Sequence, residues 1–439
     1  MKTLLFIESI NPTRTEGRYA DNMEKRFSIC MEDVKQSLQF YDFLNLKEDG
    51  EKYYNSNDFN PYHIFELTAE EMVLNTGTKL YEGMFVYVEE TDNGLLFTSG
   101  TWDPMAQELI RSNSRLRHNI LDKNTDSIRI IDGFNYDDSC VCAKSYHINV
   151  GNGNCTFILF FNTKSSYYRL WMVDCGMVDT ITHKNYKANI DIAIQKVAEE
   201  LGCNTVDIRI HRLLLTHWHA DHYNGINYLL AKGLIDVNTE FVMNLYYSCP
   251  TVCANNLLTQ LDGMDVRCYE PQVSLQMPNC KILYPNQRIG RWHNTLQNMI
   301  GITKVNNSSV VYSIGSTNKN MIFPGDLEKQ GFDRMTRAHT CRPCLYYSTY
   351  YCVSHHASLT GHINIRCLSH PYWNILDCVK QSLQYAIVMG RDEAYNGIYN
   401  AQVISDFCKS IVYSEKDNRG KMTSGFILEW KTAKVTYIY

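Results

Sequence analysis

The pattern of hydrophobic and polar positions divides the chain into two parts that differ in composition and in predicted secondary structure. Residues 1–142 are rich in Asn, Asp, Glu and Tyr, whereas strands separated by glycine turns are predicted from about Ala143 onward. In the first part, the apolar spacing predicts a helix over 27–44, two short strands within 79–98 and a helix over 103–120. No motif with recognisable chemistry occurs there. We therefore expect residues 1–142 to form a separate accessory α+β region of unassigned role.

The second part, residues 143–439, alternates predicted strands with predicted helices. The expected strands cover 147–150, 155–161, 168–173, 211–216 and 385–391. The expected helices cover 189–201, 223–232 and 401–410, and a hairpin is expected over 424–439. Alternation of this kind indicates a layered α/β domain. In such domains the ligand-binding groups lie at the carboxyl ends of strands.

One such strand end carries a dense run of metal-binding residue types. The buried strand 211–216 leads directly into four candidate ligands, His217, His219, Asp221 and His222. Imidazoles and carboxylates hold zinc and similar divalent ions, and a carboxylate can bridge two of them. A chance cluster of exposed histidines would lack this placement between a buried strand and a helix. The run therefore predicts a metal site.

Composition and charge narrow the possible partners. The chain of 439 residues has 42 basic and 47 acidic residues, a formal net charge of -5, which gives no overall electrostatic footprint for nucleic acid or an anionic membrane. A net charge of this size does not exclude a local basic patch that could bind nucleic acid. Glu8 interrupts the apolar amino-terminal run, and no stretch approaches the roughly 20 apolar residues of a membrane helix. We expect no signal peptide, no membrane contact and a soluble, cytoplasmic protein.

The sixteen cysteines are expected to be free thiols, because several lie in apolar surroundings and no signal peptide is predicted. Cys341 and Cys344 have the spacing of half a structural zinc site. A second cysteine pair at matching spacing is absent from the sequence. Free thiols are the favoured interpretation of this pair.

Further segments resemble the metallo-β-lactamase superfamily, whose signature is His-x-His-x-Asp-His. The closer resemblance is to the branch that contains the soluble hydrolase domain of the competence protein ComEC and phosphorylcholine esterase. The segments that carry it are 147–155, 173–176, 306–311, 323–328 and 353–358. The resemblance covers about 143–439, roughly two-thirds of the chain. It implies the αββα sandwich of that superfamily, with residues 1–142 as an additional region.

The resemblance also implies roles for individual residues. Asp326 would bridge two metals, with His217 and His219 on the first and Asp221, His222 and His356 on the second. Among these ligands, Asp221 is also a catalytic candidate. His355 would contact the substrate, and Glu328 would position a leaving or attacking group. Asp174 would orient the metal loop through hydrogen bonds. Zinc is the expected metal, and manganese also suits this mixed ligand set.

The resemblance leaves the roles of His293, Asn307 and Arg391 open, and Ala357 departs from the family's sequence. The additional histidine that many superfamily members place before the bridging aspartate could be His293, which lies in a polar stretch, or its place could be taken by Asn307. Ala357 replaces the glycine of the family's His-His-Gly-Ser segment and is expected to narrow the room beside the metals. Arg391 would contact a substrate phosphate or form an ordinary surface salt bridge.

The implied function is a phosphodiesterase or nuclease that acts on an anionic phosphoester such as DNA, RNA or a nucleotide. Two ions would lower the pKa of a bridging water to about neutrality, and the resulting hydroxide would attack. His355 would stabilise the developing charge or protonate the leaving oxygen. The alternatives are a hydrolase for a small phosphocholine ester, lactone or thioester, and a non-catalytic metal-stabilised binding module. Residues 1–142 would select substrate, bind a protein partner or mediate self-association.

Overall fold

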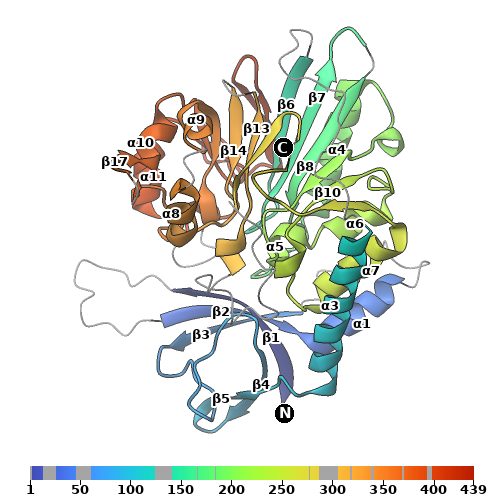
Figure 1. Ribbon diagram of the computed structural model, residues 1–439, viewed down its shortest axis with the longest axis vertical. Coiled ribbons are helices and arrows are strands. Elements are labelled where there is room, and N and C mark those ends of the chain that lie inside the picture. The colour runs from blue at the N-terminus through green and yellow to red at the C-terminus, as the bar shows by residue number, and fades with distance from the viewer. Residues whose placement is uncertain are drawn as a thin grey trace.

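The computed structural model shows a mixed α/β protein (Figure 1). It describes residues 2–12, 26–45, 61–123, 141–165, 167–182, 184–275, 277–285, 305–316, 319–337, 341–367, 370–392 and 398–439. Within these ranges the strands form sheets of five, eight and six strands and one two-stranded hairpin. Among the described helices, none is both long and apolar enough to span a lipid bilayer.

The amino-terminal region contains an antiparallel sheet with the strand order β3-β2-β1-β4-β5. Its strands are β1 (Thr3–Pro12), β2 (Arg26–Asp33), β3 (Tyr62–Thr68), β4 (Phe85–Thr91) and β5 (Gly94–Ser99). Helix α1 (Val34–Asn45) continues from β2, and α3 (Pro104–Asp122) follows β5. Asp103 caps α3 by accepting hydrogen bonds from the backbone amides of Met105 and Ala106.

Two of the three predictions for this region are confirmed. The strands expected within 79–98 are β4 and β5, and the helix expected over 103–120 is α3. The helix predicted over 27–44 is wrong in its first half, which forms β2. This strand pairs with β1 and β3, and Ile29 and Cys30 pack into different core clusters. Because both faces of β2 are buried, its apolar residues do not alternate, and the pattern resembles that of a buried helix.

The eight-stranded sheet has the order β11-β10-β9-β8-β7-β6-β20-β21, antiparallel from β21 to β8 and parallel from β8 to β11. Its strands are β6 (Val141–Ile148), β7 (Cys155–Asn162), β8 (Tyr168–Cys175), β9 (Arg212–Leu214), β10 (Glu240–Val242), β11 (Arg267–Tyr269), β20 (Gly425–Glu429) and β21 (Lys434–Ile438). Its helices are α4 (Lys187–Leu201), α5 (Ala220–Tyr223), α6 (Ile226–Ala231) and α7 (Val252–Met264).

The six-stranded sheet has the order β12-β13-β14-β15-β18-β19. Its strands are β12 (Cys280–Tyr284), β13 (Val311–Gly315), β14 (Asn320–Phe323), β15 (Ser348–Cys352), β18 (Tyr385–Val388) and β19 (Ile411–Tyr413). Helices α8 (Lys329–Arg337), α9 (Arg342–Tyr346), α10 (Ile375–Lys380) and α11 (Ala401–Phe407) and the hairpin β16 (Arg366–Cys367)–β17 (His370–Asn374) accompany it.

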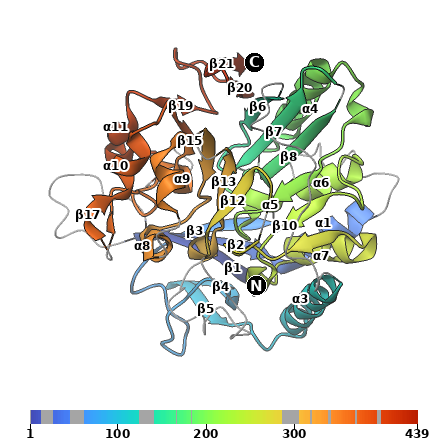
Figure 2. The same cartoon turned by 45° about the horizontal axis from the view of Figure 1, so that its top comes forward.

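The two larger sheets pack face to face, with helices on their outer sides (Figures 1 and 2). Alternate residues of each strand enter different cores: Trp171 of β8 and Met321 of β14 lie in the cluster between the sheets, whereas Met172 and Ile322 lie in the two outer clusters. This alternation follows from the two-residue period of a strand. The described chain is thus layered as helices, sheet, sheet and helices.

Several predicted elements of the second part are confirmed, among them β7, β8, α4 and the closing hairpin of β20 and β21. The single helix expected over 223–232 is instead divided into α5 and α6. Asn224 accepts hydrogen bonds from the backbone amides of Met177 and Val178, which holds the chain between the two helices. Gly225 packs so closely on Cys175 that a Cβ atom there would lie 2.7 Å from its sulfur.

The amino-terminal five-stranded sheet shares a hydrophobic core with the second part of the chain. One continuous core cluster joins Phe6, Cys30 and Ile120 to residues of the second part such as Tyr223 and Leu257. Figure 1 shows the sheet beneath α5 and α7. Helix α5 follows β9, so the sheet lies on the side of the sandwich where β9 ends. Residues 1–142 therefore help to cover that edge of the larger domain.

Three buried glutamates of the amino-terminal region fix this contact by capping segments of the second part. Glu8 accepts a hydrogen bond from the amide of Ala220 (2.9 Å), at the start of α5. Glu32 accepts from Val252 (3.0 Å) and Cys253 (3.3 Å) in the first turn of α7. In the same way Glu82 accepts from Val305 (3.0 Å), at the start of the 3-10 helix Val305–Ser308. The first amides of a helix have no partner within it and attract negative charge, so each contact is favourable.

The capping carboxylate of Glu32 leads to a pH-dependent prediction. Burial raises its pKa from 4.5 to about 7, against the lowering effect of its hydrogen bonds. Between these values the folded chain keeps a proton that the unfolded chain has released, so stability is lost as pH rises through that window. Glu32→Gln keeps an acceptor but does not titrate. The free energy of unfolding in urea should be measured for both proteins at pH 5 and pH 8. From pH 5 to pH 8, the stability of the variant relative to the wild type should rise by up to about 3 kcal/mol. A constant difference between the two proteins would contradict this prediction.

Candidate metal centre

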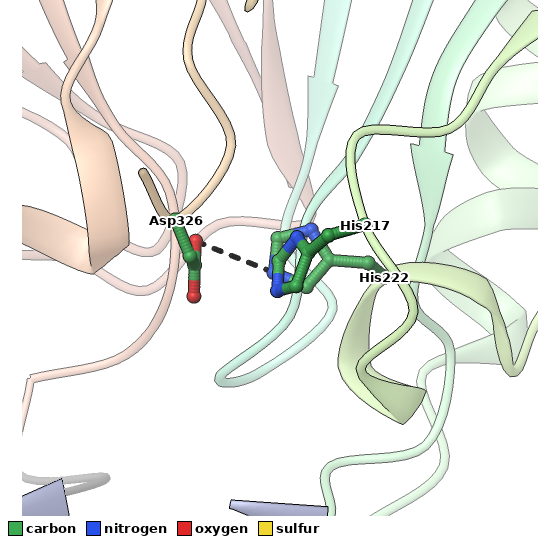
Figure 3. Close-up of side chains that lie close together, drawn as sticks. All are labelled: His217, His222 and Asp326. Carbon is green, nitrogen blue, oxygen red and sulfur yellow. Dashed lines mark ion pairs between the residues drawn. The ribbon is translucent and has the colours of Figure 1, made fainter. Parts of the chain in front are cut away.

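The candidate ligands lie where strands of both large sheets end. His217, His219, Asp221 and His222 occupy the segment that leads from β9 into α5, and all four are buried. Asp326 follows β14, while His355 and His356 follow β15 in the short 3-10 segment Ser354–Ala357. Figure 3 shows Asp326 facing His217 and His222 from the opposite side of the site. The layered fold therefore brings together residues more than 100 positions apart.

The Asp326 carboxylate lies between two imidazoles. Its Oδ1 is 3.4 Å from His222 Nε2, and its Oδ2 is 3.4 Å from His356 Nε2. On the other side, His356 Nε2 is 3.6 Å from Asp221 Oδ2. Within the described residues, two overlapping groups have ligand atoms close enough for one ion each: His217, His222 and Asp326, and Asp221, His222 and His356.

Several ligand atoms in this cluster are buried without a hydrogen-bond partner. They are the Nε2 atoms of His219, His222 and His356 and the Oδ1 atom of Asp326. Buried polar atoms are nearly always paired in folded proteins, so a concentration of unpaired ones needs an explanation. His219 is in neither close group, but it lines the pocket, and its Nδ1 is 3.1 Å from His217 Nε2. Imidazole and carboxylate atoms in this state suit divalent cations.

The electrostatics of the cluster divide the histidines into two kinds. Burial lowers the pKa of His217 well below its ordinary value and that of His219 to about 4. Both rings are therefore neutral at physiological pH, as metal ligands must be. Burial opposes protonation of His356 too, but Asp326 and Asp221 raise its pKa to about 9. The same two carboxylates that attract a proton to His356 would be neutralised by a divalent cation.

The pKa of Asp326 is shifted in the opposite direction to that of His356, because each group lies close to opposite charges. Burial opposes its ionisation, but His356, His222 and His355 hold its pKa well below the ordinary value. The pKa of His222 is raised well above its ordinary value, because Asp326, Asp174 and Asp221 outweigh the effect of burial. The Asp326 carboxylate is thus ionised and available as a ligand.

Asp174 supports the metal loop, the segment 217–222, through hydrogen bonds to Thr216 and His222. Its Oδ1 accepts a hydrogen bond from the Thr216 amide, and its Oδ2 lies 2.8 Å from both Thr216 Oγ1 and His222 Nδ1. This contact occupies Nδ1 of His222 and turns its Nε2 toward Asp326. A hydrogen bond to the second ring nitrogen commonly fixes a histidine ligand in this way.

Asp174→Asn is expected to weaken metal binding about 10- to 100-fold, because the amide cannot accept all three of these hydrogen bonds. Titration of the metal against a competing chelator would measure the change. Asp265→Asn is the matched control, since Asp265 is exposed and lies at the end of α7. Equal affinity of the two variants would contradict the orienting role of Asp174.

The turn that carries His355 and His356 is conformationally strained. His355, His356 and Ala357 have φ values of 49°, 50° and 62°, in the left-handed region that residues with a Cβ atom rarely adopt. Hydrogen bonds hold the turn, from the Tyr399 amide to the His356 carbonyl and from the Asn400 amide to the Ala357 carbonyl, each 3.0 Å long. Strain of about 1–3 kcal/mol per residue is typical of functional sites.

This conformation explains why glycine would suit position 357. The Ala357 methyl group lies in the outer core beside the six-stranded sheet and is not among the residues that line the pocket. The expectation that Ala357 narrows the room beside the metals is therefore wrong.

His355 faces the pocket, and Glu328 lies behind it. His355 Nε2 is 3.4 Å from Asn306 Nδ2 and 3.9 Å from Asp326 Oδ2. Its Nδ1 is 3.0 Å from Thr360 Oγ1 and 3.8 Å from Glu328 Oε1. Glu328 is not among the pocket-lining residues. It is therefore placed to position His355 rather than to touch a substrate.

Asn306, rather than the predicted candidate Asn307, lines the pocket. Asn307, the predicted ligand candidate, accepts a hydrogen bond from the Gly331 amide with its side-chain oxygen. Asn306 lines the pocket instead, and its Oδ1 is buried without a partner. The sequence could not decide between neighbours in a 3-10 segment, because their directions depend on how that segment packs.

Three other candidates lie away from the pocket or outside the described residues. Arg391 Nε is 3.6 Å from the buried carboxylate of Asp179, so the salt-bridge alternative describes its contact, and Arg391 does not line the pocket. Cys341 and Cys344 are buried free thiols and belong to neither metal-binding group. His293 lies outside the described residues.

Four further pocket residues were not predicted from the sequence. Glu8, Ser9 and Cys30 come from the amino-terminal sheet, and Thr180 follows β8. One available indication was Glu8 itself, a carboxylate within an otherwise apolar strand. Such a residue is seldom buried unless a specific partner compensates for it.

No protein-family model matches the chain, and no curated protein is significantly similar to it in sequence.

Proposed function

We propose that this protein is a hydrolase of the metallo-β-lactamase type that uses two divalent ions, zinc or alternatively manganese, to cleave phosphodiesters in the cytoplasm. The observation that carries the proposal is the cluster of buried ligand atoms of His219, His222, His356 and Asp326 that have no hydrogen-bond partner. His219, His356 and Asp326 line one pocket, and His222 Nε2 lies 3.4 Å from Asp326 Oδ1. Structural histidines and aspartates would be expected to pair with hydrogen-bonding partners instead.

The fold supports the same assignment. Two sheets with a shared inner core and helices on their outer sides are the layers expected of the αββα sandwich. The candidate ligands follow β9, β14 and β15, which belong to both sheets. Ligand groups at the ends of strands are the usual arrangement of layered α/β enzymes.

The ligand set fits two ions that share one carboxylate. His217 and His219 would hold the first, Asp221, His222 and His356 the second, and Asp326 would bridge them. His222 lies close to the ligand atoms of both groups, and its place on the second ion rests on its 3.9 Å approach to Asp221 Oδ1. When bound, such ions activate a water molecule and polarise the substrate oxygen.

The remaining residues supply positioning and a proton. The ring of His355 is fixed at Nδ1 by Thr360 and by Glu328 behind it, which leaves Nε2 facing the pocket beside Asn306. A histidine held in this way can donate a proton to a leaving oxygen or stabilise its charge. We assign that role to His355.

The phosphodiester substrate is proposed from the resemblance of 143–439 to phosphoester hydrolases. The test is to incubate the metal-loaded chain with single- and double-stranded DNA, RNA, bis(p-nitrophenyl) phosphate and a lactone. Turnover of phosphodiesters that stops when a chelator is added is the expected result. Cleavage of the lactone alone would favour a small-molecule hydrolase. No turnover with two metals bound would favour a binding module.

A further inference from the structure

The amino-terminal sheet contributes directly to the metal pocket. Glu8 and Ser9 of β1 and Cys30 of β2 line it together with the ligands His219, Asp221, Asp326 and His356. All three residues of the sheet are buried, with exposed fractions of 3%, 7% and 2%. The pocket thus has one wall from each part of the chain.

A β-bulge directs this wall at the metal ligands. In the pairing of β1 with β2, Ile7 is opposite Met31 and Ser9 is opposite Cys30, so Glu8 is an extra residue. Neighbouring residues of a regular strand point to opposite faces of the sheet. Bulges redirect side chains and are frequent beside active sites. The bulge explains how both Glu8 and Ser9 line the same pocket.

The wall is attached to the metal loop itself. Glu8 Oε1 accepts its 2.9 Å hydrogen bond from Ala220, the residue between His219 and Asp221. Glu32 and Glu82 hold the same sheet at two further points, on α7 and on the segment that contains Asn306. A wall with three buried attachments is a fixed part of the pocket in this conformation.

The enclosed space is small. The space between its lining atoms is about 330 Å³ with the open solvent at its mouth counted, so the enclosed part is smaller still. Two ions and one phosphoryl group with a single substituent would fill much of it. An uninterrupted polymer needs room to enter and to leave on either side of the scissile bond.

From these observations, and resting on the proposed phosphodiesterase function, we infer that the amino-terminal sheet is a specificity wall. It restricts the site to small phosphodiesters and to the ends of chains, and excludes the interior of an uninterrupted strand. Glu8 is the specificity-determining residue, because it both lines the pocket and joins the wall to the metal loop.

The test compares three substrates of the metal-loaded full chain: bis(p-nitrophenyl) phosphate, a linear single-stranded oligonucleotide, and the same oligonucleotide ligated into a closed circle. The small diester and the linear strand should be cleaved, and the circle at least about tenfold more slowly than the linear strand. Equal rates on circle and linear strand would overturn the inference.

A binding measurement separates this inference from the proposed function. If nothing is turned over, the proposed function fails, and calorimetric binding of thymidine 5′-monophosphate to the metal-loaded protein decides the inference. Binding of the nucleotide that the circle does not compete away supports the wall. Competition by the circle, or no binding of the nucleotide, would overturn it.

Glu8→Ala removes the side chain from the wall and its bond to Ala220, and should bring the rates on circle and linear strand to within about threefold. Glu8→Gln keeps an acceptor for Ala220 and should preserve the discrimination. Glu66→Ala, an exposed position on β3 of the same sheet, is the matched control. Full discrimination in a folded Glu8→Ala protein would contradict the role of Glu8.

Discussion

Asp221→Ala is expected to lose bound metal and hydrolytic activity together. The carboxylate lies between His356, at 3.6 Å, and Asn152, whose Nδ2 is 3.3 Å from Asp221 Oδ2. Its removal leaves the second ion with two imidazoles and the shared Asp326. We expect metal content to fall from two ions to one or fewer, and turnover to fall by at least about 10³-fold. Elemental analysis of the purified variant and a phosphodiester assay measure the two effects.

His355→Ala is the partner variant for this test. His355 faces the pocket but is not a proposed ligand, so the variant should keep most of its metal and lose about 10²- to 10⁴-fold in rate. The two variants therefore separate loss of metal from loss of proton transfer. Equal metal loss in both would contradict the division of roles between Asp221 and His355.

Gly176→Ala is expected to destabilise the protein strongly and to disturb the metal site. A Cβ atom at this position would lie 2.1 Å from the Asp221 carbonyl oxygen and 3.3 Å from the Gly153 Cα. These neighbours belong to the backbone, so no side-chain rotation can relieve the clash. The loop that carries Asp221 must move, and we expect a loss of about 3 kcal/mol or more in stability together with loss of metal.

Gly263→Ala is the matched control for Gly176→Ala. Gly263 lies within α7 with open space where a Cβ atom would be, so alanine should stabilise the protein by up to about 1 kcal/mol. Denaturant unfolding and metal content of both variants make the comparison. If Gly176→Ala resembled the control in both measurements, the close packing of Gly176 on the Asp221 backbone would be disproved.

The close packing of Gly176 also connects the metal site to the strand before it. Asp174, two residues earlier, holds Thr216 and His222, so the end of β8 supports the metal loop through both backbone and side chain. The pocket wall formed by Glu8 supports the same loop from the other part of the chain. The geometry of the ligands is thus determined from two directions.

Much of the local structure was predictable from the sequence. The period of 3.6 residues predicted α3 and α4, because each helix buries one face. Apolar runs of strand length bounded by turn residues predicted β7 and β8, which are buried on both faces. The prediction failed at 27–33, where β2 is also buried on both faces but continues directly into α1, so its apolar run resembles the first turns of that helix. It also failed at Asn224, where hydrogen bonds to a distant loop divide a continuous apolar pattern.

The sequence by itself determined the candidate metal ligands from His217 to His222, because ligand type and spacing within a strand-to-helix loop are local properties. Only the tertiary structure decided that Asn306 rather than Asn307 lines the pocket, and that Glu8 closes it. Glu8 meets Ala220 across 212 positions of the chain, and that contact depends on a bulge, a shared core and capped helix ends. Such contacts follow from how whole elements pack, and a local sequence pattern carries no information about that packing.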